Sequence, residues 1–274
     1  MKTVQTNWDK LSFPRLCGLL AGNPSRLSQA MHNAGFKALG IDFIYSAFPT
    51  VDTEHALKSC RELGFRGLSL TIPHKEAAMH LVDKLSDEAK KIGSINTVIN
   101  DGEYLHGINT DYFGIIQALK EVNFTSTQAL VIGAGGASRG ALYALQQMGV
   151  EKIKICNRSA DRAIKLAKEF QVEYLELESI SKWITSNSCL VVNSTPATEL
   201  FDLESISSKH TVFDMITSET QLIRKAKENG AQVVPGIRML LHQALMQFEL
   251  FTEQTAPKDV MEKALLSESQ NTSS

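Results

Sequence analysis

The segment Ala129-Leu-Val-Ile-Gly-Ala-Gly-Gly-Ala-Ser-Arg139 contains the clearest structural signal of the chain. Residues 129–132 form a short apolar run typical of a buried strand, and residues 137–148 carry apolar side chains at helical spacing. Gly149 is a usual stop for that helix, and residues 152–156 form the next apolar strand. The strand, glycine turn, helix and second strand predict a parallel βαβ unit.

The glycine turn lies where a dinucleotide-binding turn has to lie, between a strand and a helix. Gly133 permits the tight turn, and Gly135 lets backbone amides approach a pyrophosphate at the helix N-terminus. Ser138 holds the third position of this fingerprint, where glycine is usual. A glycine-rich turn in another kind of βαβ protein is the alternative, but the complete strand–helix–strand context favours dinucleotide binding in a Rossmann-type domain. The expected contacts of the turn are Gly133, Ala134, Gly135, Gly136 and Ala137.

The residues after the second strand indicate which dinucleotide binds. An NAD site places Asp or Glu there, whereas this chain has Asn157-Arg158-Ser159, with Arg162 one helical turn further on. Two guanidinium groups suit a 2′-phosphate, which they bind by charge-assisted, forked hydrogen bonds. These arginines as ordinary surface charges are the alternative. We expect NADP rather than NAD.

Around this unit, short β-branched runs alternate with amphipathic segments, which predicts an α/β fold with mainly parallel sheets. Asp101-Gly102 between two apolar runs predicts a hairpin. Residues 74–91 are expected to be helical, and the last eight residues to be a disordered tail. The other expected strands are residues 16–21, 43–48, 67–72, 96–100, 104–107, 189–192, 212–214 and 232–234. The other expected helices are residues 28–39, 53–63, 110–122, 239–251 and about 258–266.

Composition narrows the class of function. The 274 residues carry a net charge of −2, so no overall basic field attracts nucleic acid or an anionic membrane. The four cysteines lie in or beside apolar runs without metal-ligand spacing, which predicts buried free thiols, no metal site and a reducing compartment. Residues 1–15 lack the apolar region of a secretory signal, and no apolar run is long enough to span a bilayer. We therefore expect a cytoplasmic protein with a small-molecule substrate. The sequence leaves open whether it forms a homodimer.

Candidate catalytic residues follow expected strand ends, which line the ligand crevice of α/β sheets. Lys75 follows the strand at residues 67–72, and Asn96 and Asp111 lie in short polar clusters beside apolar runs. Taken singly, each has an ordinary explanation: a lysine is usually solvent-facing, and Asp111 fits a helix N-terminus.

In combination these residues resemble the shikimate dehydrogenase family, from about residue 15 to residue 266. The matching blocks, in chain order, are Ser69-Leu-Thr-Ile-Pro-His-Lys75, Gly93-Ser-Ile-Asn-Thr97, Gly107-Ile-Asn-Thr-Asp111, the glycine turn with Asn157-Arg158-Ser159, and Met239-Leu-Leu-His-Gln243-Ala. The resemblance implies a substrate and catalytic domain made of residues 1–109 and 238–274, and an NADP-binding Rossmann domain at residues 110–237. It further implies that the C-terminal helices return to the first domain.

The resemblance also implies residue roles. Lys75 and Asp111 would be the acid/base pair at the reacting hydroxyl, and Asn96 and Gln243 would hydrogen-bond ring hydroxyls. Thr71 would help on the substrate side. Further cofactor contacts would be Thr195, Met215 and Gly236.

The match breaks at the end of the site that would bind the substrate carboxylate. The family's first helix begins with a block containing two serines, and here the corresponding segment is two residues shorter, with Arg26 at the first serine position and Ser28 at the second. Ser69 replaces an asparagine, and Thr217 replaces a tyrosine. These departures are similar to those of the divergent shikimate dehydrogenase-like branch. We expect Arg26, Ser28 and Ser69 to bind substrate; in the alternative, Arg26 points to solvent and Ser25 or Ser28 acts alone.

The predicted function is hydride transfer between NADP and a ring hydroxyl of shikimate, or of a related hydroxy-ring carboxylic acid. A non-catalytic sensor of NADP or of a shikimate-pathway ligand, on the same scaffold, is the first alternative. A module that binds NADP alone is the second. Retention of both Lys75 and Asp111 favours the enzyme.

Overall fold

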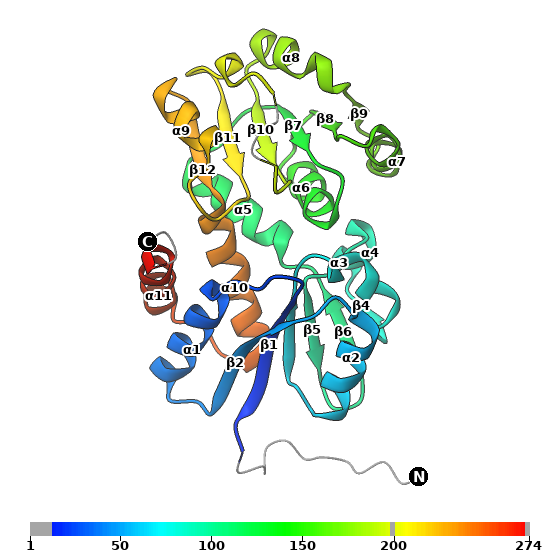
Figure 1. Cartoon of the computed structure of the whole chain (residues 1–274), viewed down its shortest axis with the longest axis vertical. Helices are drawn as coiled ribbons and strands as arrows, with labels where there is room; N and C mark the ends of the chain where they lie inside the picture. Colours follow the sequence, from blue (N-terminus) through cyan, green and yellow to red (C-terminus); the bar gives the residue numbers. More distant parts are fainter. Residues whose placement is uncertain (1–12, 198–200, 272–274) are drawn as a thin grey trace. The chain divides into compact units, whose positions relative to one another are not determined.

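The computed structural model describes residues 13–197 and 201–271, and the chain divides into two compact units (Figure 1). Unit 1 comprises Met1–Thr110 and Ala244–Ser274, and unit 2 comprises Asp111–Gln243. Each unit has a sheet and an apolar core of its own. The α/β class with two domains is therefore confirmed. The functional limits 1–109, 110–237 and 238–274 stay a prediction.

The sheet of unit 1 is mixed, with strand order β2-β1-β3-β5-β6-β4. Strand β1 is parallel to β2 and β3, whereas β5 is antiparallel to both β3 and β6. The predicted hairpin at Asp101-Gly102 accounts for the antiparallel pairing of β5 with β6. The strands are β1 (Arg15–Ala21), β2 (Phe43–Pro49), β3 (Gly67–Leu70), β4 (Lys84–Leu85), β5 (Thr97–Asn100) and β6 (Leu105–Ile108).

Helices cover both faces of this sheet. Helices α1 (Leu27–Leu39) and α11 (Lys258–Asn271) pack together, and an aromatic cluster joins α1 to β2 and to the last turns of α10 (Gly236–Thr252). Helix α2 (Thr53–Glu62) contributes to a second core cluster against β3 and β5. The prediction of one helix over residues 74–91 is wrong. The segment contains α3 (His74–Ala77), η2 (Ala78–His80), β4 and α4 (Asp87–Ile92).

Unit 2 contains a fully parallel sheet in the order β12-β11-β10-β7-β8-β9. This order confirms the Rossmann-type prediction. The strands are β7 (Gln128–Ile132), β8 (Lys152–Cys156), β9 (Glu173–Tyr174), β10 (Leu190–Asn193), β11 (Thr211–Asp214) and β12 (Gln232–Pro235).

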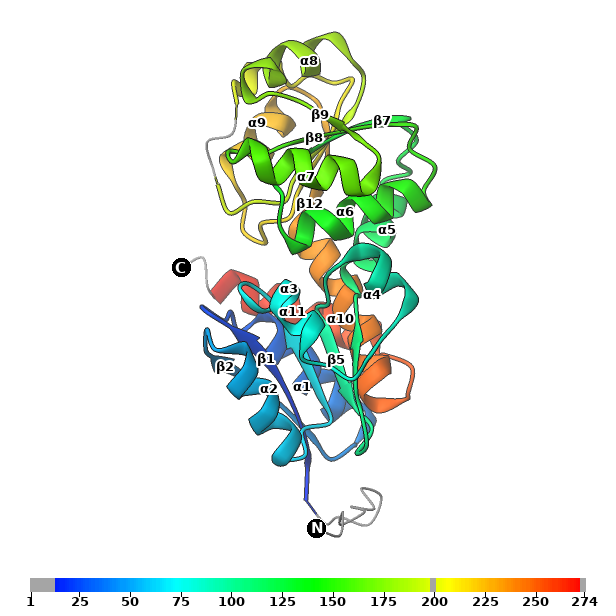
Figure 2. The ribbon, with the colours of Figure 1, turned by 90° about the vertical axis from the view of Figure 1, so that its right-hand side faces the viewer.

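Two layers of helices cover this sheet (Figure 2). One layer contains α5 (Asp111–Glu121), α6 (Gly136–Gln147) and α7 (Ala160–Phe170). The other contains η3 (Leu177–Ser179), α8 (Ile180–Ser186), η4 (Leu203–Ser205) and α9 (Gln221–Glu228). Their apolar faces are buried on the sheet; in α8, for example, Ile180 and Ile184 are both inaccessible to solvent.

Helix α10 begins in unit 2, where α5 packs closely against it. A methyl group at Gly114 would lie 2.7 Å from the carbonyl oxygen of Met239, so glycine is needed for this approach. At the end of α5, Glu121 accepts two hydrogen bonds from the Arg238 guanidinium, at 2.7 and 2.6 Å, and lies 2.8 Å from Nε2 of His242. Chiefly because of Arg238, the pKa of Glu121 falls to about 2. These contacts fix the first turns of α10.

The ends and surface of the chain test three further expectations. Helix α11 continues to Asn271, so the prediction of a disordered tail from residue 267 is wrong up to that residue. Residues 272–274 lie outside the described residues. So do residues 1–12, which make up most of the segment predicted to lack a secretory signal. Within the described ranges no helix combines the length and apolar character of a membrane span. All four cysteines are buried free thiols, as predicted.

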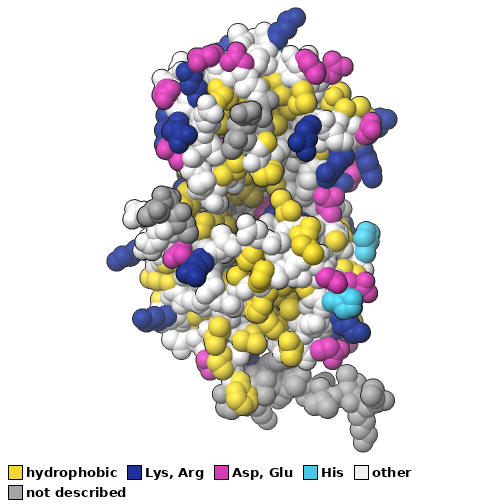
Figure 3. All heavy atoms as spheres, viewed as in Figure 1, with side chains coloured by type: hydrophobic (Ala, Val, Ile, Leu, Met, Phe, Trp, Pro, Cys, Tyr) yellow, Lys and Arg dark blue, Asp and Glu magenta, His cyan; other side chains and the backbone are white. Residues whose placement is uncertain are grey.

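One side of the surface carries many apolar side chains (Figure 3), and Leu16 and Ile44, paired in register on β1 and β2, are exposed. At the outer edge of β2, the side chain of Asn33 bonds both the N–H and the C=O of Tyr45, at 2.9 Å each. This contact satisfies backbone groups that an edge strand would otherwise expose.

Candidate functional site

The glycine turn after β7 has the geometry that its sequence predicts. Gly133 has φ +124°, a backbone angle that residues other than glycine rarely adopt, and a Cβ there would lie 2.5 Å from Oγ of Ser194. The Gly133 N–H donates to the carbonyl oxygen of Cys156, which ties the turn to the end of β8 (2.8 Å). Only glycine fits this position.

Open space lies in front of the helix that follows. A Cβ built on Gly135 meets no described atom within 4 Å. Ser138, at the third fingerprint position, accepts a hydrogen bond from the Gly135 N–H (3.1 Å) and lies 2.8 Å from Oγ of Ser194. The serine thus stabilises the turn from behind, and the space before the N-terminus of α6, with Gly136 and Ala137 in its first turn, fits a pyrophosphate.

Further polar groups gather at the same edge of the sheet of unit 2. Arg162 donates to the carbonyl oxygen of Ala134 in the turn (3.1 Å), and Arg158 is exposed at the end of β8. The side chain of Asn157, directly before Arg158, donates to the carbonyl oxygen of Ser159 (3.1 Å). The two guanidinium groups, which follow β8, fit a phosphate on the ribose of a dinucleotide.

The remaining cofactor candidates follow the carboxyl ends of β10, β11 and β12, which a parallel sheet brings to the edge that carries the glycine turn. Thr195 bonds Oδ1 of Asn193 through its N–H and its hydroxyl, at 3.0 and 2.9 Å. The Met215 N–H donates to the carbonyl oxygen of Asn193 (2.9 Å), and a Cβ at Gly236 would lie 2.5 Å from Met215. All twelve predicted cofactor contacts therefore lie at or beside one sheet edge.

In unit 1, Lys75 follows the end of β3, as predicted, and Thr71 also follows it because β3 ends at Leu70 rather than at residue 72. The backbone carbonyl of Lys75 accepts from the N–H of Ile95 (2.9 Å). The neighbouring His74 is fully buried: its Nδ1 lies 2.8 Å from the Thr53 hydroxyl and its Nε2 lies 3.0 Å from the carbonyl oxygen of Thr50. Because a carbonyl oxygen only accepts, Nε2 carries the proton. Sequence reasoning missed this support of the lysine segment.

Asn96 lies in a buried polar network. Its Oδ1 accepts from the N–H of Thr110 (2.7 Å) and from the Thr97 hydroxyl (2.9 Å), and its Nδ2 donates to the Thr110 hydroxyl (2.9 Å). Gln247 joins the network from α10 and also accepts a hydrogen bond from Ser69 (2.9 Å). Sequence reasoning identified Asn96 and Ser69 but missed Gln247, which repeats Gln243 one helical turn later.

The predicted carboxylate end is divided between surface and interior. Arg26 is exposed directly before α1, whereas Ser28, in the first turn, is buried.

Asp111, the predicted partner of Lys75, is the first residue of α5 and is also buried. Lys75 belongs to unit 1, and Asp111 and Gln243 belong to unit 2. The prediction that Lys75, Asp111 and Gln243 act on the same substrate molecule stays a prediction.

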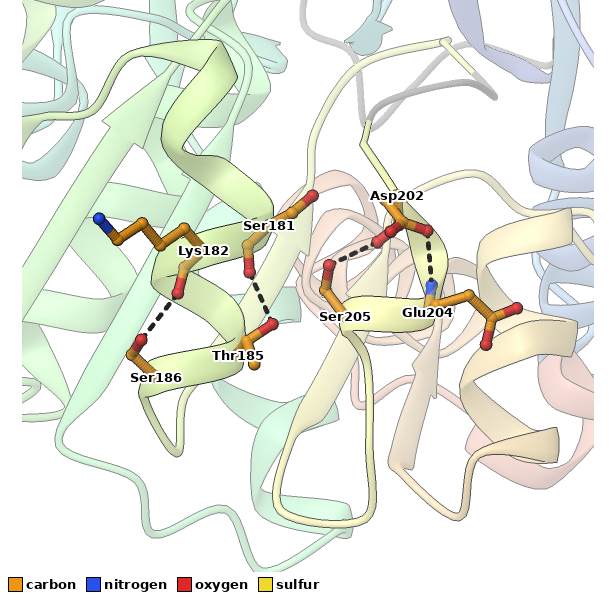
Figure 4. Close-up of a pocket in the computed structure, with 7 residues that line it drawn as sticks. All are labelled: Ser181, Lys182, Thr185, Ser186, Asp202, Glu204 and Ser205. Carbon is orange, nitrogen blue, oxygen red and sulfur yellow. Dashed lines mark hydrogen bonds between the residues drawn. The ribbon is translucent and has the colours of Figure 1, made fainter.

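A surface groove elsewhere in unit 2 (Figure 4) contains none of the predicted site residues. It lies between α8 and η4. Its hydroxyl groups bond nearby backbone carbonyls; for example, Thr185 bonds Ser181 (2.8 Å) and Ser205 bonds Asp202 (2.7 Å). These are local helix contacts, so the groove adds nothing to the site.

A Rossmann-type unit with a phosphate-binding turn, joined to an α/β unit with a buried polar cluster, defines a dinucleotide-dependent oxidoreductase fold. Three family models match the chain: the shikimate dehydrogenase substrate binding domain at residues 20–98, shikimate/quinate 5-dehydrogenase at residues 116–212, and the shikimate 5′-dehydrogenase C-terminal domain at residues 236–266. The chain belongs to the shikimate dehydrogenase family.

Individual relatives align with almost the whole length of this chain. Shikimate dehydrogenase (NADP(+)) of Methanopyrus kandleri is 36% identical and covers 90% of this chain and 93% of its own. The shikimate dehydrogenase-like protein of Haemophilus influenzae is 32% identical, with 91% and 95% covered. The structure of shikimate 5-dehydrogenase from Thermus thermophilus in complex with NADP(H) and shikimate has a TM-score of 0.83 at 32% identity, with 93% and 100% covered.

Proposed function

We propose that this chain catalyses hydride transfer between NADP and a ring hydroxyl of shikimate, the reaction that reduces 3-dehydroshikimate in the other direction. The observation that carries the proposal is the phosphate-binding turn with two arginines after β8, in a family member that retains Lys75, Asn96 and Asp111. NADP, when bound, supplies the hydride acceptor and donor; the protein has to bind, orient and move a proton.

The residues of unit 2 hold the dinucleotide. The N–H groups at the start of α6 bind the pyrophosphate, because a helix N-terminus leaves its first amides without backbone partners. Arg158 and Arg162 bind the 2′-phosphate, which a carboxylate at the same place would repel. The enzyme therefore prefers NADP to NAD.

The acid/base pair works on the substrate hydroxyl. Lys75 and Asp111 remove the proton from that hydroxyl during oxidation and return it during reduction, a role for which a positioned amine and carboxylate suffice. Asn96, Gln243 and Thr71 hydrogen-bond the substrate and select its hydroxyls.

The carboxylate end is the part in which this chain differs from the family pattern. Arg26, Ser28 and Ser69 bind the acid end of the substrate, with the guanidinium of Arg26 able to form a forked ion pair. Arg26 is exposed directly before the first turn of α1, so its guanidinium is accessible both to solvent and to a ligand. Replacing Arg26 by Ala raises KM for shikimate if the role is right and leaves KM unchanged if Arg26 only faces solvent.

The test of the function is a direct assay. Purified protein, NADP+ and shikimate are mixed, with quinate and other hydroxy-ring acids in parallel, and absorbance of the reduced cofactor is followed. Turnover of shikimate that Lys75→Ala abolishes, with NADP binding unchanged, supports the proposal. Thermal stabilisation by shikimate without turnover contradicts it and favours a sensor.

Neither the fold nor the relatives support the two alternatives, a sensor and a module for NADP alone. We also propose a cytoplasmic location, with which the four buried free thiols agree. The homodimer remains open, and light scattering on the purified protein decides it.

A further inference from the structure

Gln247 lies on α10, one helical turn after the predicted substrate residue Gln243, and is 1% exposed. Its carboxamide connects α10 to two strands of unit 1, β3 and β5, and to the backbone of Asn96 just before β5. Oε1 accepts from the Ser69 hydroxyl on β3 (2.9 Å), and Nε2 donates to the Thr97 hydroxyl on β5 (2.9 Å) and to the backbone carbonyl of Asn96 (3.2 Å). A polar side chain buried this deeply is retained only when its hydrogen bonds are made.

The direction of each hydrogen bond follows from its neighbours. The Asn96 carbonyl oxygen can only accept, so the nitrogen of Gln247 must face it and the oxygen must face Ser69. The Thr97 hydroxyl then accepts a hydrogen bond from Nε2 of Gln247 and donates one to Oδ1 of Asn96 (2.9 Å). The N–H of Thr110 donates to the same oxygen (2.7 Å).

This order constrains how Asn96 meets a substrate. Oδ1 already accepts from Thr97 and from Thr110, which occupies both lone pairs. The amide plane is therefore fixed, with Nδ2 as the donating end, and one of its N–H groups donates to the Thr110 hydroxyl (2.9 Å). A substrate oxygen at Asn96 has to accept a hydrogen bond, as a hydroxyl oxygen with free lone pairs does.

We infer that Gln247 is a positioning residue for Asn96, and that the Ser69–Gln247–Thr97 chain sets the specificity of the site for a hydroxyl that accepts at Asn96. The inference rests on the proposed function. Gln247 acts through Thr97 and the Asn96 backbone, without touching the substrate. Ser69 serves this chain in addition to any contact that it makes with the substrate.

The test compares four single variants in the shikimate assay. Gln247→Met keeps the length of the side chain and removes all three hydrogen bonds, so KM for shikimate rises about tenfold, the cost of one to two hydrogen bonds. KM for NADP+, which binds through unit 2, stays unchanged. Ser69→Ala removes one anchor and gives a smaller rise.

Gln247→Glu adds a pH readout. Its carboxylate still accepts from Ser69 but repels the carbonyl oxygen of Asn96, so KM for shikimate rises further as pH increases and the new acid loses its proton. Thr252→Val is the matched control. It removes a buried hydroxyl on the same helix, which bonds the carbonyl oxygen of Phe248 (2.7 Å), and lowers stability without changing KM.

The outcomes separate the inference from the function on which it rests. Wild-type protein that neither binds nor turns over shikimate overturns both. If wild type turns over shikimate and folded Gln247→Met has an unchanged KM for shikimate, the inference alone is overturned. The inference is also overturned if Gln247→Met raises KM for shikimate and KM for NADP+ equally, or if Thr252→Val raises KM for shikimate as much as Gln247→Met does. If Gln247→Met does not fold, Gln247→Glu decides, because position 247 has no predicted contact with the substrate: a selective rise in KM for shikimate with pH, relative to wild type, supports the inference, and an unchanged KM overturns it.

Discussion

His32 should make the protein sensitive to mild acid. The imidazole on α1 is fully buried, stacks on Tyr45 with ring centroids 4.4 Å apart, and also packs against Phe36, Phe248 and Phe251. Neither ring nitrogen has a hydrogen-bond partner within the described part of the chain. Burial lowers the pKa of His32 from 6.5 to about 3, and the interaction of the ring with the Gln247 side chain offsets only part of the loss of water around the charged form.

The size of the effect follows from proton linkage. Between pH 6.5 and pH 3 the unfolded chain binds a proton at His32 that the folded chain does not, so the free energy of unfolding falls as pH falls. The loss is about 1.4 kcal/mol for each pH unit below 6.5, or about 2 kcal/mol at pH 5. Tyr45, the titratable neighbour in the cluster, does not contribute here, since burial raises its pKa above the usual value of 10.

The assay is urea unfolding at pH 7.5, 6 and 5 for wild type and His32→Phe. Phenylalanine fills a similar volume among aromatic rings and has no polar group to leave unpaired, so the variant is expected to be at least as stable at pH 7.5. It should lose about 2 kcal/mol less than wild type between pH 7.5 and pH 5. His80→Gln, a change at an exposed histidine, is the control and should match wild type.

Equal pH dependence in wild type and His32→Phe would refute this reasoning, because it would mean that His32 is hydrated or protonated in the folded state. The buried His74, whose pKa burial also lowers, leaves a residual slope in both proteins.

Three predictions concern the site. Lys75→Ala should lower kcat by about 10²–10⁴-fold without changing NADP binding, as expected for loss of an acid/base group, and stopped-flow traces with fluorescence titration check this. Replacing Arg158 and Arg162 together by Ala should raise KM for NADP+ at least about tenfold and leave KM for NAD+ nearly unchanged; a parallel loss with both cofactors would rule out a role at the 2′-phosphate. Gly133→Ala should lower the melting temperature, because φ is +124° and Cβ would clash with Ser194, whereas Gly135→Ala should leave melting unchanged and weaken NADP binding by filling the open space; equal melting of the two variants would contradict the assignment.

The cofactor unit could be predicted closely because its signals are local. The glycine turn, the strand before it and the arginines after β8 lie within residues 129–162, and their roles follow from backbone geometry and charge. The structure adds the reason why a serine is accepted at the third fingerprint position: the Ser138 hydroxyl accepts a hydrogen bond from the Gly135 N–H and lies within hydrogen-bond distance of the Ser194 hydroxyl.

The substrate unit was harder to predict. Residues 74–91 have helical periodicity, yet Leu81 ends η2 and the short β4 pairs with β6, since pairing with a neighbouring strand outweighs local propensity. The polarity of residues 267–274 favours a disordered tail, but α11, whose buried residues are Met261 and Leu265, continues to Asn271.

The α/β class, the dinucleotide turn, the arginine pair and the candidates Lys75, Asn96 and Asp111 can all be read from the amino-acid sequence, because each is marked by residues close together in the chain. Only the tertiary structure placed Gln247 on Ser69, which is 178 residues away, and His74 on Thr53. The physical reason is that a buried polar group needs a partner, and the partner is chosen by which elements pack together, a choice that no local pattern of residues records.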